Sequence, residues 1–157
     1  VLEIGCGRGD GAAHIAREYG ARVHAVDLDP DQIALARRLH GGCERLVFSV
    51  ADASDLDLPD GSVDLIVCQH VFHHLPDWRG AVAEIRRVLR PGGHVVWLDL
   101  VMPAWLCGVF RPFADSMGVF TFGEVAGAFS GAGLEPCAHR SFHVVGLPHH
   151  DMLLRRP

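Results

Sequence analysis

The chain has 157 residues, of which 49% are hydrophobic and 21% are charged. This length suits a single domain, residues 1–157, with its own buried core, and the composition is typical of a globular protein rather than a disordered one. The net charge of −5, with no strong cluster of lysine or arginine, argues against nucleic acid as a partner.

The cysteines and the apolar segments indicate in which cellular compartment the protein is expected. Five scattered cysteines without a Cys-x-x-Cys pair indicate reduced thiols, as in a cytoplasmic protein. The most apolar window, residues 94–110, is interrupted by Asp99 and Pro103 and is too short to cross a bilayer. We therefore expect no membrane span and no signal peptide.

Apolar runs typical of strands alternate with helical patterns along the chain. The strand patterns cover residues 1–4, 21–28, 45–52, 62–70 and 94–100. The helical patterns cover residues 11–20, 29–42, 77–93 and 121–134. Two further strands are expected at residues 135–145 and 151–156.

Capping signals support two of these helices. Asp29 is a suitable N-cap for the second helix, which Gly41 should end. Thr121 and Glu124 have the spacing of a capping box at the start of the last helix. In the first helix the pattern places Tyr19 on the apolar face, and in the third Pro91 and the glycines after it are expected to close the helix.

The alternation of strands and helices predicts an α/β fold. Parallel strands need long, right-handed crossover connections, so the order indicates a doubly wound, mostly parallel sheet with helices on both faces. The last two strands have no helix between them and should form an antiparallel hairpin at the edge, which makes seven strands. In such folds a ligand binds at the carboxyl ends of the strands.

The turn after the first strand contains alternating glycines. Gly5, Gly7 and Gly9 would let backbone amides approach a bulky ligand, and the helix that follows would point its N-terminus at the same space. A dinucleotide fingerprint would need a third glycine where this chain has Asp10, whose charge would face a pyrophosphate. The spacing therefore favours a cofactor without phosphate.

Several stretches resemble the class I S-adenosylmethionine-dependent methyltransferases, in particular the group called methyltransferase type 11 or ubiquinone/menaquinone-methyltransferase-like. These stretches are LEIGCGRG, AVDLDP, VADASDLDLPDGSVDLIVCQHVFHHLPD and RRVLRPGGHVV, in the family's order. The resemblance covers nearly the whole chain and implies a Rossmann-like fold, S-adenosylmethionine as the cofactor and a small-molecule methyl acceptor. It also implies that a lead-in helix or helices are missing before residue 1.

The resemblance assigns the cofactor site residue by residue. Glu3 would hold the glycine loop and meet the methionine amino group, Asp27 would accept both ribose hydroxyls, and Asp52 would accept from the adenine amino group. The remaining predicted contacts to the cofactor are Gly5, Cys6, Gly7, Gly9, Leu28, Ala53, Cys68 and Gln69.

Each assignment has a structural alternative. Gly11 and Gly41 are expected to serve turns or helix ends rather than the ligand. Asp55 or Asp57 could take the place of Asp52. Glu3 within a strand needs a cationic or hydrogen-bonded partner, because burying an unpaired charge is costly.

Three histidines follow the fourth strand at helical spacing: His70, His73 and His74. No carboxylate or cysteine completes a recognisable metal site with them, so we expect no metal. His70 is the candidate general base for a phenol or enol, whereas His73 and His74 are expected to pack or cap.

Residues 101–123 form the candidate cap on the substrate side. Their apolar side chains suggest an apolar or aromatic acceptor, with Arg111 as a fixed cation, although the same residues could simply cover the sheet edge. These apolar residues are Met102, Trp105, Leu106, Phe110, Phe113, Met117 and Phe120. Two other functions stay open: binding of S-adenosylmethionine without catalysis, and an NAD-dependent oxidoreductase. The sequence does not indicate the oligomeric state.

Overall fold

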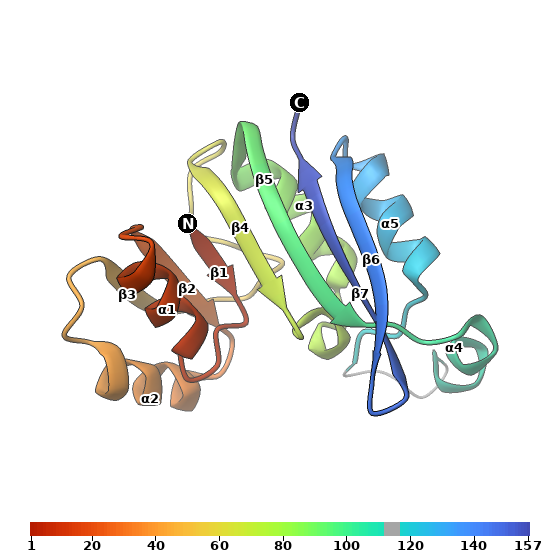
Figure 1. Ribbon diagram of the computed structural model, residues 1–157, viewed down its shortest axis with the longest axis horizontal. Coiled ribbons are helices and arrows are strands. Elements are labelled where there is room, and N and C mark those ends of the chain that lie inside the picture. The colour runs from red at the N-terminus through yellow and green to blue at the C-terminus, as the bar shows by residue number, and fades with distance from the viewer. Residues whose placement is uncertain (112–116) are drawn as a thin grey trace.

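The computed structural model describes residues 1–111 and 117–157 (Figure 1). The strands are β1 (Leu2–Ile4), β2 (Val23–Asp27), β3 (Leu46–Val50), β4 (Val63–Gln69), β5 (Leu89–Leu100), β6 (Glu135–Val144) and β7 (Leu147–Arg155). The helices are α1 (Asp10–Glu18), α2 (Pro30–His40), α3 (Trp78–Val88), α4 (Ala104–Phe110), α5 (Phe122–Gly131) and the short 3-10 helix η1 (Phe72–His74).

The strands form one seven-stranded sheet in the order β3-β2-β1-β4-β5-β7-β6. Strands β1 to β5 are parallel, and β7 pairs antiparallel with both β5 and β6. The predicted doubly wound, mostly parallel sheet with an antiparallel edge hairpin is therefore confirmed. The chain order changes direction between β1 and β4, so a crevice is expected at their carboxyl ends.

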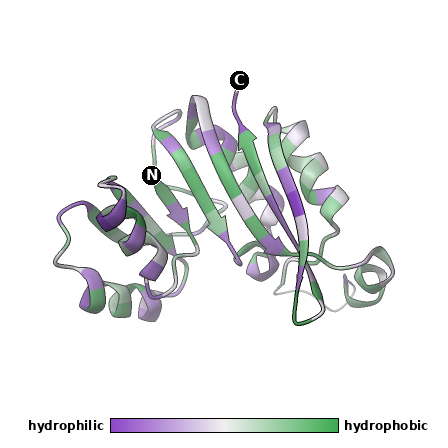
Figure 2. Cartoon of the chain, viewed as in Figure 1, coloured by the Kyte–Doolittle hydropathy of each residue, from purple (hydrophilic) through white to green (hydrophobic). Residues whose placement is uncertain are grey.

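Helices cover both faces of the sheet, and each face has its own core. Helices α1 and α2 pack on the side of β2 and β3, whereas α3 and α5 pack on the other face across β4, β5 and β7 (Figure 1). Strand β4 is largely apolar, whereas the edge strand β6 and helices α1 and α2 carry polar residues (Figure 2). In β1, Leu2 and Ile4 point into the larger core, so Glu3 between them faces the α1 side.

Two helix ends differ from the prediction. Helix α3 ends at Val88, and Pro91 with the two glycines after it belongs to β5. Leu89 is already extended, and a proline disfavours helical conformation in the residue before it, so the helix ends earlier than the glycines suggest. Helix α1 ends at Glu18, and Tyr19 is 75% exposed rather than packed on the apolar face.

The capping predictions hold. The Asp29 carboxylate accepts from the backbone N–H of Asp31, and Gly41 is the C-cap of α2. Thr121 and Glu124 form the predicted capping box of α5. Within the described ranges, no helix has both the length and the apolar character needed to cross a membrane.

Candidate functional site

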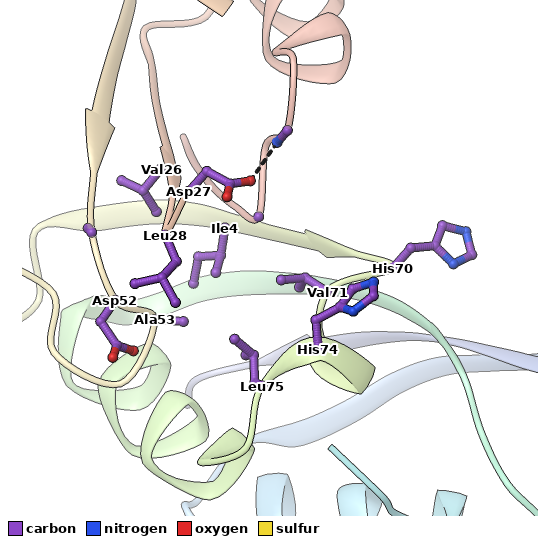
Figure 3. Close-up of a pocket in the computed structure, with 13 residues that line it drawn as sticks. Ile4, Val26, Asp27, Leu28, Asp52, Ala53, His70, Val71, His74 and Leu75 are labelled. Atoms are coloured by element: carbon purple, nitrogen blue, oxygen red, sulfur yellow. Dashed lines mark hydrogen bonds between the residues drawn. The ribbon is translucent and has the colours of Figure 1, made fainter. Parts of the chain in front are cut away.

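A cavity of about 310 Å³ opens at the carboxyl ends of β1, β2 and β4 (Figure 3). Seven of the predicted site residues line it: Gly5, Gly7, Asp27, Leu28, Asp52, Ala53 and His70. The other lining residues are Ile4, Val26, Ala51, Val71, His74 and Leu75. The strands thus bring together residues that lie up to about seventy positions apart in the sequence, as the parallel fold requires.

The glycine loop forms one wall of this cavity. Gly5, Gly7 and Gly9 all have positive φ, of 73°, 50° and 84°. A Cβ at Gly5 would lie 2.3 Å from Val71, and a Cβ at Gly9 would lie 2.6 Å from the Phe48 ring. Both the backbone conformation and the close packing therefore require glycine at these positions.

Asp27 ends β2 and holds this loop in place. Its Oδ2 accepts the backbone N–H of Gly7 at 2.7 Å, and its Oδ1 accepts the backbone N–H of Asp29 at 3.0 Å (Figure 3 shows the first bond). Each carboxylate oxygen can accept a further hydrogen bond. Asp27 is half-buried on the cavity wall, so it can accept from a ligand while it orients the loop.

Glu3 lies behind the loop rather than in the cavity wall. It is 6% exposed, and the backbone N–H of Ala12 donates to its carboxylate. Its Oε2 is buried and has no hydrogen-bond partner among the residues that the structure describes. Burial raises the pKa of Glu3 to about 7, and the Ala12 bond only partly offsets this rise. A buried carboxylate with an unpaired oxygen is a suitable partner for a cationic group.

Four other predicted residues do not line the cavity: Cys6, Gly9, Cys68 and Gln69. Cys6 and Cys68 are buried, and burial raises the pKa of both thiols, that of Cys6 to about 12. These thiols are therefore neutral at physiological pH and unreactive. Gln69 is exposed at the end of β4, and Gly9 is the N-cap of α1.

Leu28, which follows Asp27 in the cavity lining, is 61% exposed, although it is a large apolar side chain. Asp52 is also exposed, and its Oδ1 accepts from both the backbone N–H and the hydroxyl of Ser54. Ala53 is buried beside it. Leu28 and Asp52 therefore offer an apolar surface and a hydrogen-bond acceptor to the same cavity (Figure 3).

The histidines do not share a helical face, contrary to their spacing. His70 precedes η1 with a positive φ of 53°, an uncommon conformation for a residue other than glycine. Its imidazole points away from Asp27 and Leu28, whereas the His74 imidazole lies beside Val71 (Figure 3). The His70 ring instead meets the His149 ring edge to face, with centroids 5.4 Å apart.

His73 pairs with a residue that sequence reasoning passed over. Its Nδ1 lies 2.5 Å from Oδ1 of Asp99, a β5 residue that is 0% exposed. The only sequence signal for Asp99 was an acid within an otherwise apolar strand, which a buried carboxylate with partners explains. The expectation that His73 packs or caps therefore needs this addition: it binds a buried carboxylate.

The segment 101–123 contains α4, but several of its residues do not serve as predicted. Phe120 is 1% exposed and belongs to the core rather than to a lining, and Phe113 lies outside the described residues. Arg111 donates to both carboxylate oxygens of Glu124, at 2.9 and 3.0 Å, so an anion neutralises this cation. Trp105, Phe110 and Met117 are exposed.

The sequence predicted only some of the residues that line the cavity. Ile4, Val26 and Ala51 are apolar positions next to predicted contacts, and Val71, His74 and Leu75 fall in the segment after the fourth strand. Across residues 1–111 and 117–157, no three His, Cys, Asp or Glu side chains are grouped so that they could hold a metal ion.

The comparisons with known proteins agree with this fold. Residues 2–97 match the family model described as a methyltransferase domain. A fatty-acid O-methyltransferase of Mycolicibacterium smegmatis is 38% identical over 63% of this chain and 36% of its own length. A 2-methyl-6-phytyl-1,4-hydroquinone methyltransferase of Synechocystis is 35% identical over 81% of this chain and 42% of its own length.

A solved structure shows the same fold at low identity. Geranyl diphosphate C-methyltransferase from Streptomyces coelicolor, in complex with S-adenosyl-L-homocysteine, superposes with a TM-score of 0.84 at 17% identity, covering 99% of this chain and 73% of that one. The chain spans less than half the length of the curated relatives that it matches. Because the family model covers more than half of the chain, the chain belongs to the methyltransferase-domain family of class I S-adenosylmethionine-dependent methyltransferases.

Proposed function

We propose that this chain is the S-adenosylmethionine-binding domain of a methyltransferase that acts on a small apolar or aromatic molecule. The observation that carries the proposal is the cavity at the carboxyl ends of β1 and β2, where the glycine loop faces Asp27 and Leu28. Family membership supports the cofactor, and the chemistry of the lining residues fits it.

The residues present suit the parts of this cofactor. The unpaired Oε2 of buried Glu3 suits the methionine ammonium, directly or through water. Asp27 keeps free lone pairs for the ribose hydroxyls, and exposed Leu28 offers an apolar face to the adenine. Asp52 would accept from the adenine amino group. Gly5, Gly7 and Ala53 complete the proposed contacts in the cavity wall. Cys6, Gly9, Cys68 and Gln69, which the resemblance also assigned to the cofactor, lie outside the cavity lining.

The bound cofactor supplies a methyl group already activated on a sulfonium sulfur. The chain's own task is then to hold the acceptor in line and to exclude water, which can contribute roughly 7–11 kcal/mol of the barrier. Residues 101–123 form the cap on the acceptor side in this proposal. The exposed apolar side chains of Trp105, Phe110 and Met117 support an apolar acceptor.

The two relatives described above support an apolar acceptor. The names of these two relatives refer to a fatty acid and to a phytylated hydroquinone, both of which are largely apolar small molecules. The proposal includes neither nucleic acid nor metal. All five cysteines are free thiols, which supports a reducing, cytoplasmic environment.

Calorimetry and thermal unfolding with S-adenosylhomocysteine, S-adenosylmethionine and NADH test the proposal. S-adenosylhomocysteine should stabilise the fold by about 2.7 kcal/mol at a hundredfold excess over Kd. Stabilisation by NADH but not by S-adenosylhomocysteine would contradict the proposal. A methyl-release assay on phenols and hydroquinones then separates catalysis from binding alone.

A further inference from the structure

The carboxylate of Asp99 is the most enclosed charge next to the candidate site. Its side chain is 0% exposed and accepts three hydrogen bonds. Phe72 N–H donates to Oδ2 at 2.7 Å, while Leu100 N–H at 2.7 Å and His73 Nδ1 at 2.5 Å reach Oδ1. Asp99 therefore ties the end of β5 to η1, the helix that contains His73 and His74.

This arrangement fixes which nitrogen of His73 carries the proton. An ionised carboxylate only accepts hydrogen bonds, so Nδ1 of His73 must donate. A neutral imidazole has one N–H, which leaves Nε2 with a free lone pair. The His73 side chain is 21% exposed and its ring contacts that of His74, which lines the cavity, with centroids 4.0 Å apart.

We propose that His73, oriented by Asp99, is the proton acceptor of the methyl transfer and that the acceptor is therefore an alcohol or phenol. This inference rests on the proposed function. The hydroxyl proton passes to Nε2 while the oxygen's electron pair forms the bond to the methyl carbon. The bond from that carbon to sulfur breaks, and its pair stays on sulfur, giving S-adenosylhomocysteine. The imidazolium forms beside the buried Asp99 carboxylate and later loses its proton to water.

The acceptor class follows from the need for a base. A carboxylic acid is already ionised near neutral pH and needs no proton acceptor, whereas an alcohol or phenol keeps its proton. A fixed, carboxylate-oriented imidazole therefore suits a hydroxyl acceptor, whereas a carboxylic acid would have no use for it. Removing such a base should cost about 10²- to 10⁴-fold in rate.

The geometry favours His73 as the proton acceptor, whereas the sequence favoured His70. His70 donates its backbone N–H to Leu98 O, and its ring meets the edge of His149. Among the described residues, no carboxylate hydrogen-bonds to the His70 ring. Nothing fixes the tautomer of His70 in the way that Asp99 fixes that of His73.

Long-range ¹H–¹⁵N NMR of the protein with S-adenosylhomocysteine tests the tautomer without any acceptor. We expect His73 to be protonated at Nδ1 with a bare Nε2. The Asp99→Asn variant should lose this preference, because an amide can donate to Nδ1 as well as accept. A His73 protonated at Nε2 in the wild type overturns the proposal.

Turnover of a panel of phenols and hydroquinones tests the proton transfer. His73→Asn keeps a donor near the position of Nδ1 but removes Nε2, so the tie to Asp99 is retained and the base is lost. We expect this variant to lose about 10²-fold or more in rate while its affinity for S-adenosylhomocysteine stays within about twofold. The exposed His14→Gln change on α1 is the matched control and should have no effect.

The outcomes are distinguishable. If His73→Asn turns over like the wild type, the pair is only a structural tie and the proposal is wrong. If His70→Ala alone loses the rate, His70 is the base instead. If wild-type protein does not bind S-adenosylhomocysteine, the proposed function fails, whereas the NMR result still reports on the Asp99–His73 pair.

Discussion

The Glu3 carboxylate lies in the space that a side chain at position 11 would occupy. A Cβ built on Gly11 would come within 2.4 Å of Glu3 Oε1. Gly11 lies in the first turn of α1, and Ala12 beside it donates its backbone N–H to the same carboxylate. Gly11, which the sequence predicted to serve only a turn or a helix end, thus makes room for the buried Glu3 carboxylate.

We expect Gly11→Ala to destabilise the fold by about 1–3 kcal/mol, because the added methyl group overpacks the Glu3 carboxylate. Urea unfolding measures this change. Gly127→Ala in α5, where an added Cβ meets nothing within 4 Å, is the control and should stabilise by about 0.5–1 kcal/mol. Combining Gly11→Ala with Glu3→Ala should remove the penalty, and a penalty that persists would rule out the Glu3 contact as its cause.

The raised pKa of Glu3 predicts a pH-dependent stability. The folded state holds this proton up to a pKa of about 7, whereas the unfolded state releases it near the ordinary glutamate pKa of 4.5. Stability should therefore fall as pH rises from about 4.5 to 7, by an amount on the order of 3 kcal/mol, and then level off. Urea unfolding at several pH values measures the slope, and subtracting the Glu3→Gln slope isolates this group. Equal slopes in the two proteins would contradict the assignment.

Asp27→Asn should weaken binding of S-adenosylhomocysteine by roughly 1.5–3 kcal/mol, the scale of hydrogen bonds to a charged group. The amide keeps one acceptor oxygen but cannot replace both bonds from Gly7 and Asp29 together with those from a ligand. Isothermal titration calorimetry gives the change in Kd. Asp57→Asn, outside the cavity lining, is the control. Unchanged affinity in a folded Asp27→Asn protein would remove Asp27 from the cofactor site.

Phe72→Ala should cost about 3–5 kcal/mol, because it empties a fully buried site between the Trp97 and Phe129 rings. Phe72 is the first residue of η1, so the cavity wall formed by Val71 and His74 should loosen as well. Thermal unfolding and ligand affinity measure the two effects. Phe142→Ala, at a position that is 37% exposed, should cost far less, and equal losses would argue against this account.

The fold could be predicted from the sequence because the spacing of apolar residues marks its strands and helices, and capping residues mark the helix ends. Asp29, Thr121 and Glu124 act locally, and the structure confirms their capping roles. Helix α3 ended earlier than predicted, because the restriction that Pro91 places on the residue before it was not weighed against the glycine signal.

Only those residues of the candidate site that stand at the ends of predicted strands could be predicted from the sequence. Gly5, Gly7 and Asp27 stand at strand ends, so their convergence follows from parallel topology. The pairing of His73 with Asp99 joins residues 26 positions apart through tertiary packing, and no local pattern records it. The same holds for Arg111, whose partner Glu124 also belongs to a capping box.

The central strand β1 is only three residues long, yet it alone links β2 on one side to β4 on the other. The sheet is therefore built of two blocks, β3-β2 and β4-β5-β7-β6, joined by a narrow seam. The cavity lies across this seam. Asp27 lines it from β2 in one block, and Val71 lines it from the segment that follows β4 in the other block. A ligand there would bridge the blocks, so it should slow hydrogen exchange of the β1 amides more than that of amides within either block.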